Sequence, residues 1–197
     1  MKYKILMLIL FVFSSCSEKE SLNQNYNSFF KCVNTGIEHR ASKSYGLENF
    51  NFINTMNGIE QKLLEKNILK GTDKDSYKEF ANDFEASKYH IFKIMKENFP
   101  ESVFQVLTNF YGINNDIGLC YRKFYKNNKN FPDMNTFFNA YNTLSNLKRQ
   151  EISAALTKII DSYNKENFKD KRKRAIILYF IYSQCIRMDV LEEIIKK

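Results

Sequence analysis

Apolar residues recur at steps of three and four positions along much of this chain. The first clear stripe consists of Phe52, Met56, Ile59 and Leu63. A second consists of Ile152, Ala155, Leu156, Ile159, Ile160 and Tyr163. Positions at this spacing lie on one face of a helix, and such a stripe is typical of an amphipathic helix packed on a core. The pattern therefore predicts a helix in each of these two stretches.

Glycine and proline residues divide the pattern into segments. Gly36 is expected to end a first short helix. The polar stretch 37–46 that follows it is expected to be a loop. Pro100 and Pro132 suit the first turn of a helix, so each is expected to open one. Residues 113–131 carry little periodicity and are predicted to be irregular.

The most apolar stretch after residue 20 lies near the C-terminus. From Ala175 to Tyr182 the only polar side-chain groups are tyrosine hydroxyls. A buried strand would also suit Ile, Tyr and Phe. A helix is favoured because residues 169–174 lead into the run without a turn signal, and no second comparable strand is present to pair with it. We therefore expect the central helix of the core here, and a separate short amphipathic helix at 190–197.

Together these segments predict an all-α fold of about seven or eight helices, with no convincing strand. We expect a single compact multi-helix bundle or irregular helical array that spans residues 29–197. The composition agrees, because the chain has only 6 Gly and 2 Pro but 18 Phe and 12 Tyr. Few breakers favour long regular elements, and the rings supply bulk for a core.

A different hydrophobic pattern occupies the start of the chain. Lys2 and Lys4 precede nine uninterrupted apolar residues, Ile5–Phe13, and the run ends at Ser14. A helix needs about 20 apolar residues to cross the membrane core, so this run is too short to be an anchor. A charged start, a short apolar run and small residues behind it are typical of a cleaved export signal.

Phe13, Ser14, Ser15 and Cys16 close this signal. They resemble the lipobox of bacterial lipoproteins position for position, except that Phe13 stands where Leu is usual. The resemblance implies that residues 1–15 are a signal peptide, that Cys16 carries a diacylglyceryl group on its sulfur, and that its new amino end is acylated. Two or three acyl chains would hold the protein firmly on a bilayer. An ordinary cleaved signal and a retained anchor are the alternatives.

The residues that follow Cys16 are polar. The stretch 16–28 contains Glu18, Lys19 and Glu20 and few apolar side chains, so we predict a lipidated polar tether. By analogy with lipoproteins, a Ser after the lipidated Cys is compatible with sorting to the outer membrane. The charged cluster beyond it resembles the tags of lipoproteins exposed at the cell surface. The expected location is therefore the cell envelope, at the outer membrane, with surface exposure left open.

The chain carries a formal charge of +8. A positive envelope protein attracts anionic lipid heads, acidic polysaccharide or nucleic acid. Lys and Asn are frequent throughout, however, so composition alone also explains the excess. The partners expected from the sequence are the membrane, through the lipid anchor, and a protein or anionic molecule of the envelope. Nucleic acid is not favoured.

Three cysteines remain once Cys16 is assigned to the lipid. An exported protein meets an oxidising compartment, where three thiols permit one internal bridge. Cys185 follows the apolar run and is predicted to be a small buried hydrophobic residue. Cys32 lies beside an apolar stripe and Cys120 lies in the segment predicted to be irregular. The predicted disulfide therefore joins Cys32 to Cys120.

The most unusual local feature is the cationic run formed by Lys171, Arg172, Lys173 and Arg174. If a helix begins near Asn167, these charges crowd its positive end, which is unfavourable. Two interpretations stay open. Either the helix begins earlier and the charges lie on a solvated flank, which is favoured, or the four side chains bind a phosphate or an acidic partner.

Motifs for metal binding and catalysis are not found. His39 and His90 are far apart, and neither has a carboxylate or thiol at the spacing that places two ligands on one helix face. No Gly-x-Ser-x-Gly elbow or phosphate-binding glycine loop is present. We therefore expect no metal, no cofactor and no nameable catalytic residue, and a binding or interaction domain rather than an enzyme. An envelope enzyme without a recognisable motif and a structural or assembly component remain alternatives.

Overall fold

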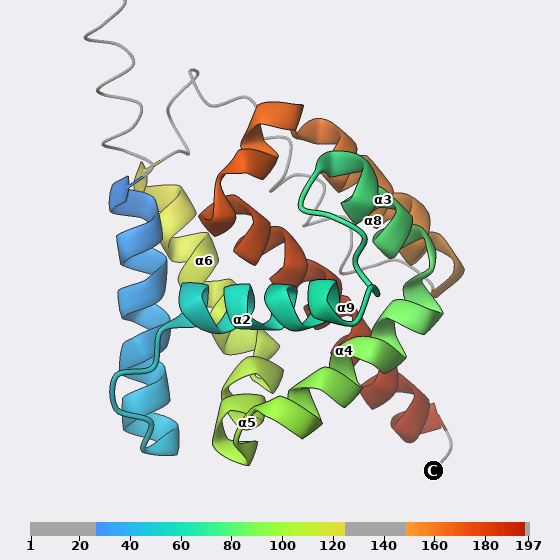
Figure 1. The fold of residues 1–197 in the computed structure, drawn as a ribbon. Helices are drawn as coiled ribbons and strands as arrows, with labels where there is room; N and C mark the ends of the chain where they lie inside the picture. The colour runs from blue at the N-terminus through green and yellow to red at the C-terminus, as the bar shows by residue number, and fades with distance from the viewer. Residues whose placement is uncertain (1–26, 125–148, 196–197) are drawn as a thin grey trace, which may run out of the picture.

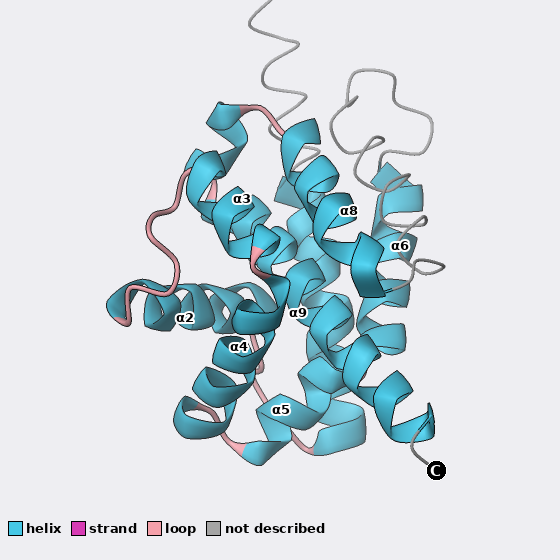
Figure 2. Ribbon diagram, turned by 90° about the vertical axis from the view of Figure 1, so that its right-hand side faces the viewer, coloured by secondary structure: helices cyan, strands magenta, loops and turns pink. Residues whose placement is uncertain are grey.

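The computed structural model describes residues 27–124 and 149–195. Within these ranges the chain forms eight α-helices, one 3-10 helix and no strand (Figures 1 and 2). The all-α prediction is confirmed. The helix expected after Pro132 lies outside the described residues, as do Cys16 and the signal segment.

Within each described range the helices follow one another with short connections. The first spans residues 27–45 and is drawn in blue in Figure 1. The next are α2 (Phe52–Glu65), α3 (Lys74–Asn82), α4 (Phe84–Asn98), α5 (Glu101–Thr108) and α6 (Phe110–Phe124). The second described range contains α8 (Arg149–Ser162), the 3-10 helix η1 (Lys165–Lys169) and α9 (Lys171–Ile195).

Helix α9 is the centre of the fold. Each side chain from Ala175 to Tyr182 is at most 2% exposed, as expected for a helix that is apolar on all sides. The helices α2, α4, α5 and α8 contact α9, which runs through the middle of the molecule (Figure 1). The prediction of a central core helix is confirmed. The prediction of a separate helix at 190–197 is wrong, because residues 190–195 continue α9.

Helix 27–45 corrects the prediction for the first segment. It passes through Gly36 and through most of the predicted loop at 37–46. Gly36 faces α6 closely: a Cβ atom there would lie 3.4 Å from the Cβ atom of Asp116. The helix ends instead before Gly46, whose φ of 66° is one that residues with a side chain rarely adopt.

Helix α6 corrects the prediction of an irregular stretch at 113–131. The chain is helical as far as Phe124, although this segment includes Gly118 and is rich in Asn. Local helix propensity is low here, but α6 lies along helix 27–45 (Figure 1) and buries Ile117 and Cys120. Packing of this kind routinely overrides a weak local preference.

Helices α4 and α5 meet at one end of the molecule. Pro100 precedes α5, as the sequence predicted, and its carbonyl accepts hydrogen bonds from the backbone of Val103 and Phe104. In both views α4 and α5 lie at the lower end (Figures 1 and 2), and Figure 1 shows that helix 27–45 starts toward the upper end. No helix in the described ranges is sufficiently long and apolar to cross a membrane.

Candidate functional site

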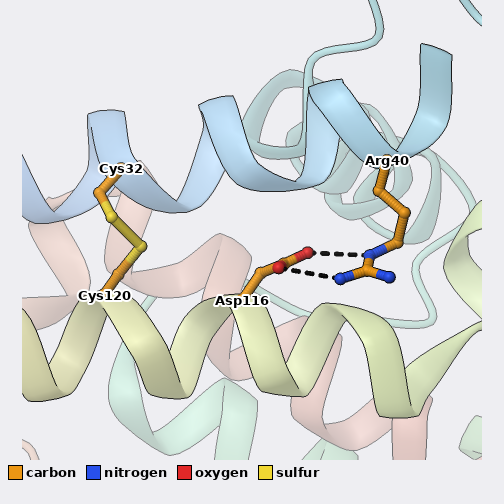
Figure 3. Close-up of a disulfide and its surroundings, with 4 residues drawn as sticks. All are labelled: Cys32, Arg40, Asp116 and Cys120. Carbon is orange, nitrogen blue, oxygen red and sulfur yellow. Dashed lines mark hydrogen bonds and ion pairs between the residues drawn. A yellow bond between two sulfur atoms is a disulfide. The ribbon is translucent and has the colours of Figure 1, made fainter. Parts of the chain in front are cut away.

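A disulfide joins two helices that are far apart in the sequence. Cys32 of helix 27–45 is bonded to Cys120 of α6, with 5.9 Å between their Cα atoms (Figure 3). These are the two cysteines that the sequence analysis paired. The bond spans 88 positions, and closure of a loop this long restricts the unfolded chain strongly. Cys185 lies on α9, where its side chain is not among those described.

An ion pair reinforces the same helix contact. Nε and Nη2 of Arg40 donate to the two carboxylate oxygens of Asp116, each at 3.0 Å (Figure 3). The hydrogen bond to Asp116 raises the pKa of Arg40, against an opposing effect of burial. The two hydrogen bonds fix the orientation of the guanidinium relative to the carboxylate. The disulfide and this pair therefore fasten helix 27–45 to α6 in a structural role.

The cationic run begins directly after a carboxylate. Helix α9 starts at Lys171, and Asp170 accepts hydrogen bonds from the backbone nitrogen of Arg172 at 2.9 Å and from its guanidinium at 3.0 and 2.8 Å. Burial alone would raise the pKa of Asp170, but the hydrogen bonds from Arg172 and the charges of Arg172 and Lys173 lower it. The carboxylate of Asp170 therefore accepts a hydrogen bond from the backbone at the start of α9 and also neutralises part of the positive charge of the cationic run.

Arg174 points into the core, where its side chain is 12% exposed. Its guanidinium donates to the two carboxylate oxygens of Glu60 at 2.7 and 3.1 Å, and to the carbonyl of Phe168 at 2.6 Å. The hydroxyl of Tyr77 also donates to Glu60. Burial, followed by the charge of Glu60, raises the pKa of Tyr77 well above its usual value. We call Glu60, Tyr77 and Arg174 the Glu60 cluster, which joins α2, α3 and α9.

The remaining contacts show how the cationic run is used. Lys173 donates to the side-chain oxygen of Asn167. The guanidinium of Arg172 also lies 4.8 Å from the ring centre of Phe30. Arg172, Lys173 and Arg174 thus turn toward separate partners within the chain, whereas Lys171 is exposed. Helix α9 begins at the first residue of the run, later than the favoured interpretation of the sequence expected.

A groove on α4 and α5 is absent from the predictions made from sequence. Its volume is about 900 Å³. Its lining residues are Tyr89, Phe92, Lys93, Lys96, Phe99, Glu101 and Phe104. Four of these seven residues are aromatic. We call this hollow the α4–α5 groove.

The aromatic lining is supported by the core. The ring centre of Phe92 lies 6.0 Å from that of Phe104 and 6.1 Å from that of Tyr182 on α9. Phe92, Phe99 and Phe104 are partly buried, whereas Tyr89 at the groove is 63% exposed. Ring contacts at these distances are favourable. The α4–α5 groove is thus lined by three phenylalanine rings that pack against the core and by one exposed tyrosine ring.

The charged lining residues differ in their partners. Lys93 lies 4.0 Å from Glu97, whose own carboxylate accepts a hydrogen bond from Lys66 at 2.8 Å. That hydrogen bond lowers the pKa of Glu97, despite an opposing effect of burial. Across residues 27–124 and 149–195, no hydrogen bond or ion pair involves the ammonium group of Lys96. Lys96 is therefore a cation at the groove that is available to a ligand.

The sequence does carry a signal for this groove. A second stripe consists of Tyr89, Phe92, Lys93 and Lys96 on α4 and of Phe99 directly after its end. It runs beside the fully buried stripe of Ile91, Ile94 and Met95. Helical spacing alone does not show which aromatic stripe a neighbouring helix covers, because that depends on the tertiary arrangement.

A second, smaller hollow of about 290 Å³ lies beside α3. Its lining includes Lys70, Glu79, Asp83 and His90. Lys70 and Glu79 form an exposed ion pair with each other. Another lining residue, Ser76, donates its hydroxyl to Asp73 at 2.8 Å. In the part of the chain that the structure describes, no three His, Cys, Asp or Glu side chains are grouped so that they could hold a metal ion.

The two hollows differ in chemical character. The smaller one is lined by polar groups, several of which bind one another, and the larger one by rings and an available cation. The fold and the α4–α5 groove together define an all-α protein with an open aromatic groove. No family model, curated protein or solved structure matches the chain.

Proposed function

We propose that this protein is a lipid-anchored component of the bacterial cell envelope, at the outer membrane, whose helical domain binds a partner molecule in the α4–α5 groove. The observation that carries the proposal is the groove itself, an open and largely aromatic hollow of about 900 Å³. Ligand sites typically measure about 300–1,000 Å³, with apolar walls and a few polar groups. Gathered apolar side chains that stay open also favour binding, because large apolar patches are rarely left uncovered.

Membrane attachment is supported by the export signal and by the lipobox that ends at Cys16. Residues 27 and 28 are already helical, so the tether is shorter than the predicted stretch 16–28. The start of helix 27–45 and the helices of the groove lie at opposite ends of the molecule (Figure 1). A chain anchored through Cys16 would therefore present the groove away from its point of attachment.

A catalytic function has weaker support. The smaller hollow brings His90 and Asp83 to one surface, which is the kind of convergence that an enzyme needs. Lys70 and Glu79 are paired with each other there, with side chains 66% and 59% exposed. Groups so well solvated and mutually engaged are poor candidates for general acids or bases.

The anchor is tested by intact-mass analysis of the membrane fraction. The wild-type chain is expected to begin at Cys16 and to carry the mass of a diacylglyceryl group, and Cys16→Ala is expected to lose both. A wild-type chain without lipid mass would refute membrane attachment. It would leave the groove as the binding site of a freely secreted protein.

The groove is tested by site-specific crosslinking in cells. The photoreactive residue p-benzoylphenylalanine replaces Tyr89, which lines the groove, or Leu119, which is 52% exposed on α6. Irradiation is expected to give an adduct at position 89 and little at position 119. Equal or absent adducts at the two positions would refute binding in the groove and favour the structural or assembly alternative.

A further inference from the structure

The wall of the α4–α5 groove is suited to hydrocarbon. Phe92, Phe99 and Phe104 contribute rings without a hydrogen-bonding group. A peptide backbone placed against these rings would lose its hydrogen bonds to water and gain none from them. A hydrocarbon chain carries no such groups, and its transfer from water to an apolar surface is favourable. The wall therefore favours an alkyl chain over a polypeptide.

The charged groups of the groove favour a monoanion. Lys93 and Lys96 line it together with one carboxylate, Glu101. Lys93 is close to Glu97, which is bound to Lys66. Lys96 has no hydrogen-bond or ion-pair partner within the described ranges. A lysine can lay its methylene stem along rings while its ammonium group stays in water, so Lys96 can meet a charged head at the groove edge. One available cation beside a carboxylate matches a single negative charge better than a dianion.

The size and place of the groove favour one molecule over a membrane surface. Its volume of about 900 Å³ lies within the range of small-molecule sites. The groove lies at the other end of the molecule from the start of helix 27–45, which is the described segment nearest in sequence to Cys16 (Figure 1).

We infer that the α4–α5 groove binds a long-chain fatty acid. The alkyl chain lies against Phe92, Phe99 and Phe104, and the carboxylate is bound by Lys96. The inference rests on the binding function proposed above and specifies the class of its ligand. No covalent step is involved.

The test uses photoreactive amphiphiles on the full, anchored chain in its own membrane. The probe is hexadecanoate that carries a diazirine and an alkyne. Matched probes replace its carboxylate with a hydroxyl or with a trimethylammonium group. Hexadecanoate is expected to label peptides from α4 and α5 about two- to fivefold more than either matched probe, the discrimination that one exposed ion pair gives. All probes enter the bilayer, so labelling is compared at equal membrane content.

Variants at one lysine test where the head group binds. Lys96→Glu is expected to lower hexadecanoate labelling of α4 and α5 by about fivefold or more, and Lys96→Arg to retain most of it. The matched control is Lys158→Glu, which reverses the charge of an exposed lysine on α8 that does not line the groove. Labelling of α4 and α5 in that control variant is expected to equal the labelling in wild type. Thermal melting of each variant checks that the fold is kept.

The outcomes separate this inference from the proposed function. Equal labelling by the three probes, labelling outside α4 and α5, or an unchanged Lys96→Glu variant would each overturn the fatty-acid assignment. A protein-sized or phospholipid adduct at position 89, without hexadecanoate labelling, would overturn it as well and leave the groove as a binding site. Absence of both probe labelling and an adduct at position 89 would refute both proposals.

Discussion

The Glu60 cluster and the α4–α5 groove contain similar side chains, but these differ in their exposure to solvent and in their pairing. Each places a tyrosine and a cation beside phenylalanine rings. In the Glu60 cluster, a carboxylate from α2 binds Arg174 and Tyr77, and the tyrosine is completely buried. At the groove, Tyr89 is 63% exposed, and no carboxylate from the described ranges binds Lys96. One region is closed by the chain itself, and the other is left open.

The difference teaches that a cation-rich sequence does not by itself reveal a binding site. The run Lys171–Arg174 is the most conspicuous positive feature of the sequence, yet Asp170 and Glu60 bind its two arginines. Lys93 and Lys96 are ordinary in sequence and line the groove. A paired, buried ion contributes to specificity of the fold, whereas an unpaired one at an apolar hollow is available for recognition.

Breaking the buried ion pair of the Glu60 cluster is expected to have the largest effect on stability. Glu60→Gln removes the charge that compensates Arg174, so we expect the free energy of unfolding to fall by about 4 kcal/mol. The measurement is urea denaturation followed by circular dichroism. The control Glu65→Gln lies on the same helix in an exposed pair with Lys62, and should leave the free energy of unfolding close to that of wild type because solvent screens such a pair. Equal losses in the two variants would remove the distinction between closed and open ion pairs.

The disulfide is a second contact that the chain closes by itself, here by a covalent bond between helix 27–45 and α6. Combined Cys32→Ser and Cys120→Ser substitutions are expected to lower the free energy of unfolding by about 3 kcal/mol, because the unfolded chain regains the freedom of a long loop. Denaturation of the wild type with and without dithiothreitol provides an independent measurement. A loss below about 1 kcal/mol would instead show that packing and the Arg40–Asp116 pair hold the two helices together.

Asp170 gives a smaller effect that depends on pH. Its pKa is lower in the folded chain, so the ionised group adds stability above its unfolded pKa, and this is lost as pH falls through the folded value. Asp170→Asn is expected to cost about 1 kcal/mol at pH 7, through the lost contacts at the start of α9. The difference from wild type should shrink below about pH 4.

Denaturation curves at several pH values test this dependence. Asp75→Asn is a suitable control, because Asp75 lies in the first turn of α3 with its side chain 75% exposed. A gap between wild type and Asp170→Asn that stays constant with pH would contradict the assignment of the effect to the carboxylate charge.

Substitutions at the α4–α5 groove should affect stability least. Tyr89→Ser and Lys96→Glu are each expected to alter the free energy of unfolding by less than about 0.5 kcal/mol, because both side chains lack tertiary pairing that the fold needs. The measurement is the same urea denaturation. A loss comparable to that of Glu60→Gln would mean that the groove is part of the structural core and would weaken its assignment as a binding surface.

Several elements of this molecule follow from local sequence patterns. The stripe from Phe52 to Leu63 predicts α2, and the run from Ala175 to Tyr182 predicts the buried centre of α9. Pro100 marks the start of α5. These predictions succeed because spacing and side-chain chemistry act over one or two turns. The pairing of Cys32 with Cys120 followed from elimination among three thiols.

Other elements depended on contacts between distant segments. Gly36 looked like a helix end, but it lies inside a helix where α6 approaches closely. The residues of α6 looked irregular, but they are helical along helix 27–45, where a disulfide and an ion pair hold them. Local patterns carry no information about such neighbours, because each contact joins residues separated by many positions.

The sequence by itself determined the all-α class and the central apolar helix, since each depends on residues that are close together in the chain, and the proposed export signal and lipobox likewise rest on local sequence alone. Only the tertiary structure decided which charges are compensated and which remain available. Glu60 reaches Arg174 across 114 positions, whereas Lys96 has no such partner among the described residues. The physical reason is that compensation of a charge requires a second group within a few ångströms, and only the packing of whole helices sets that distance.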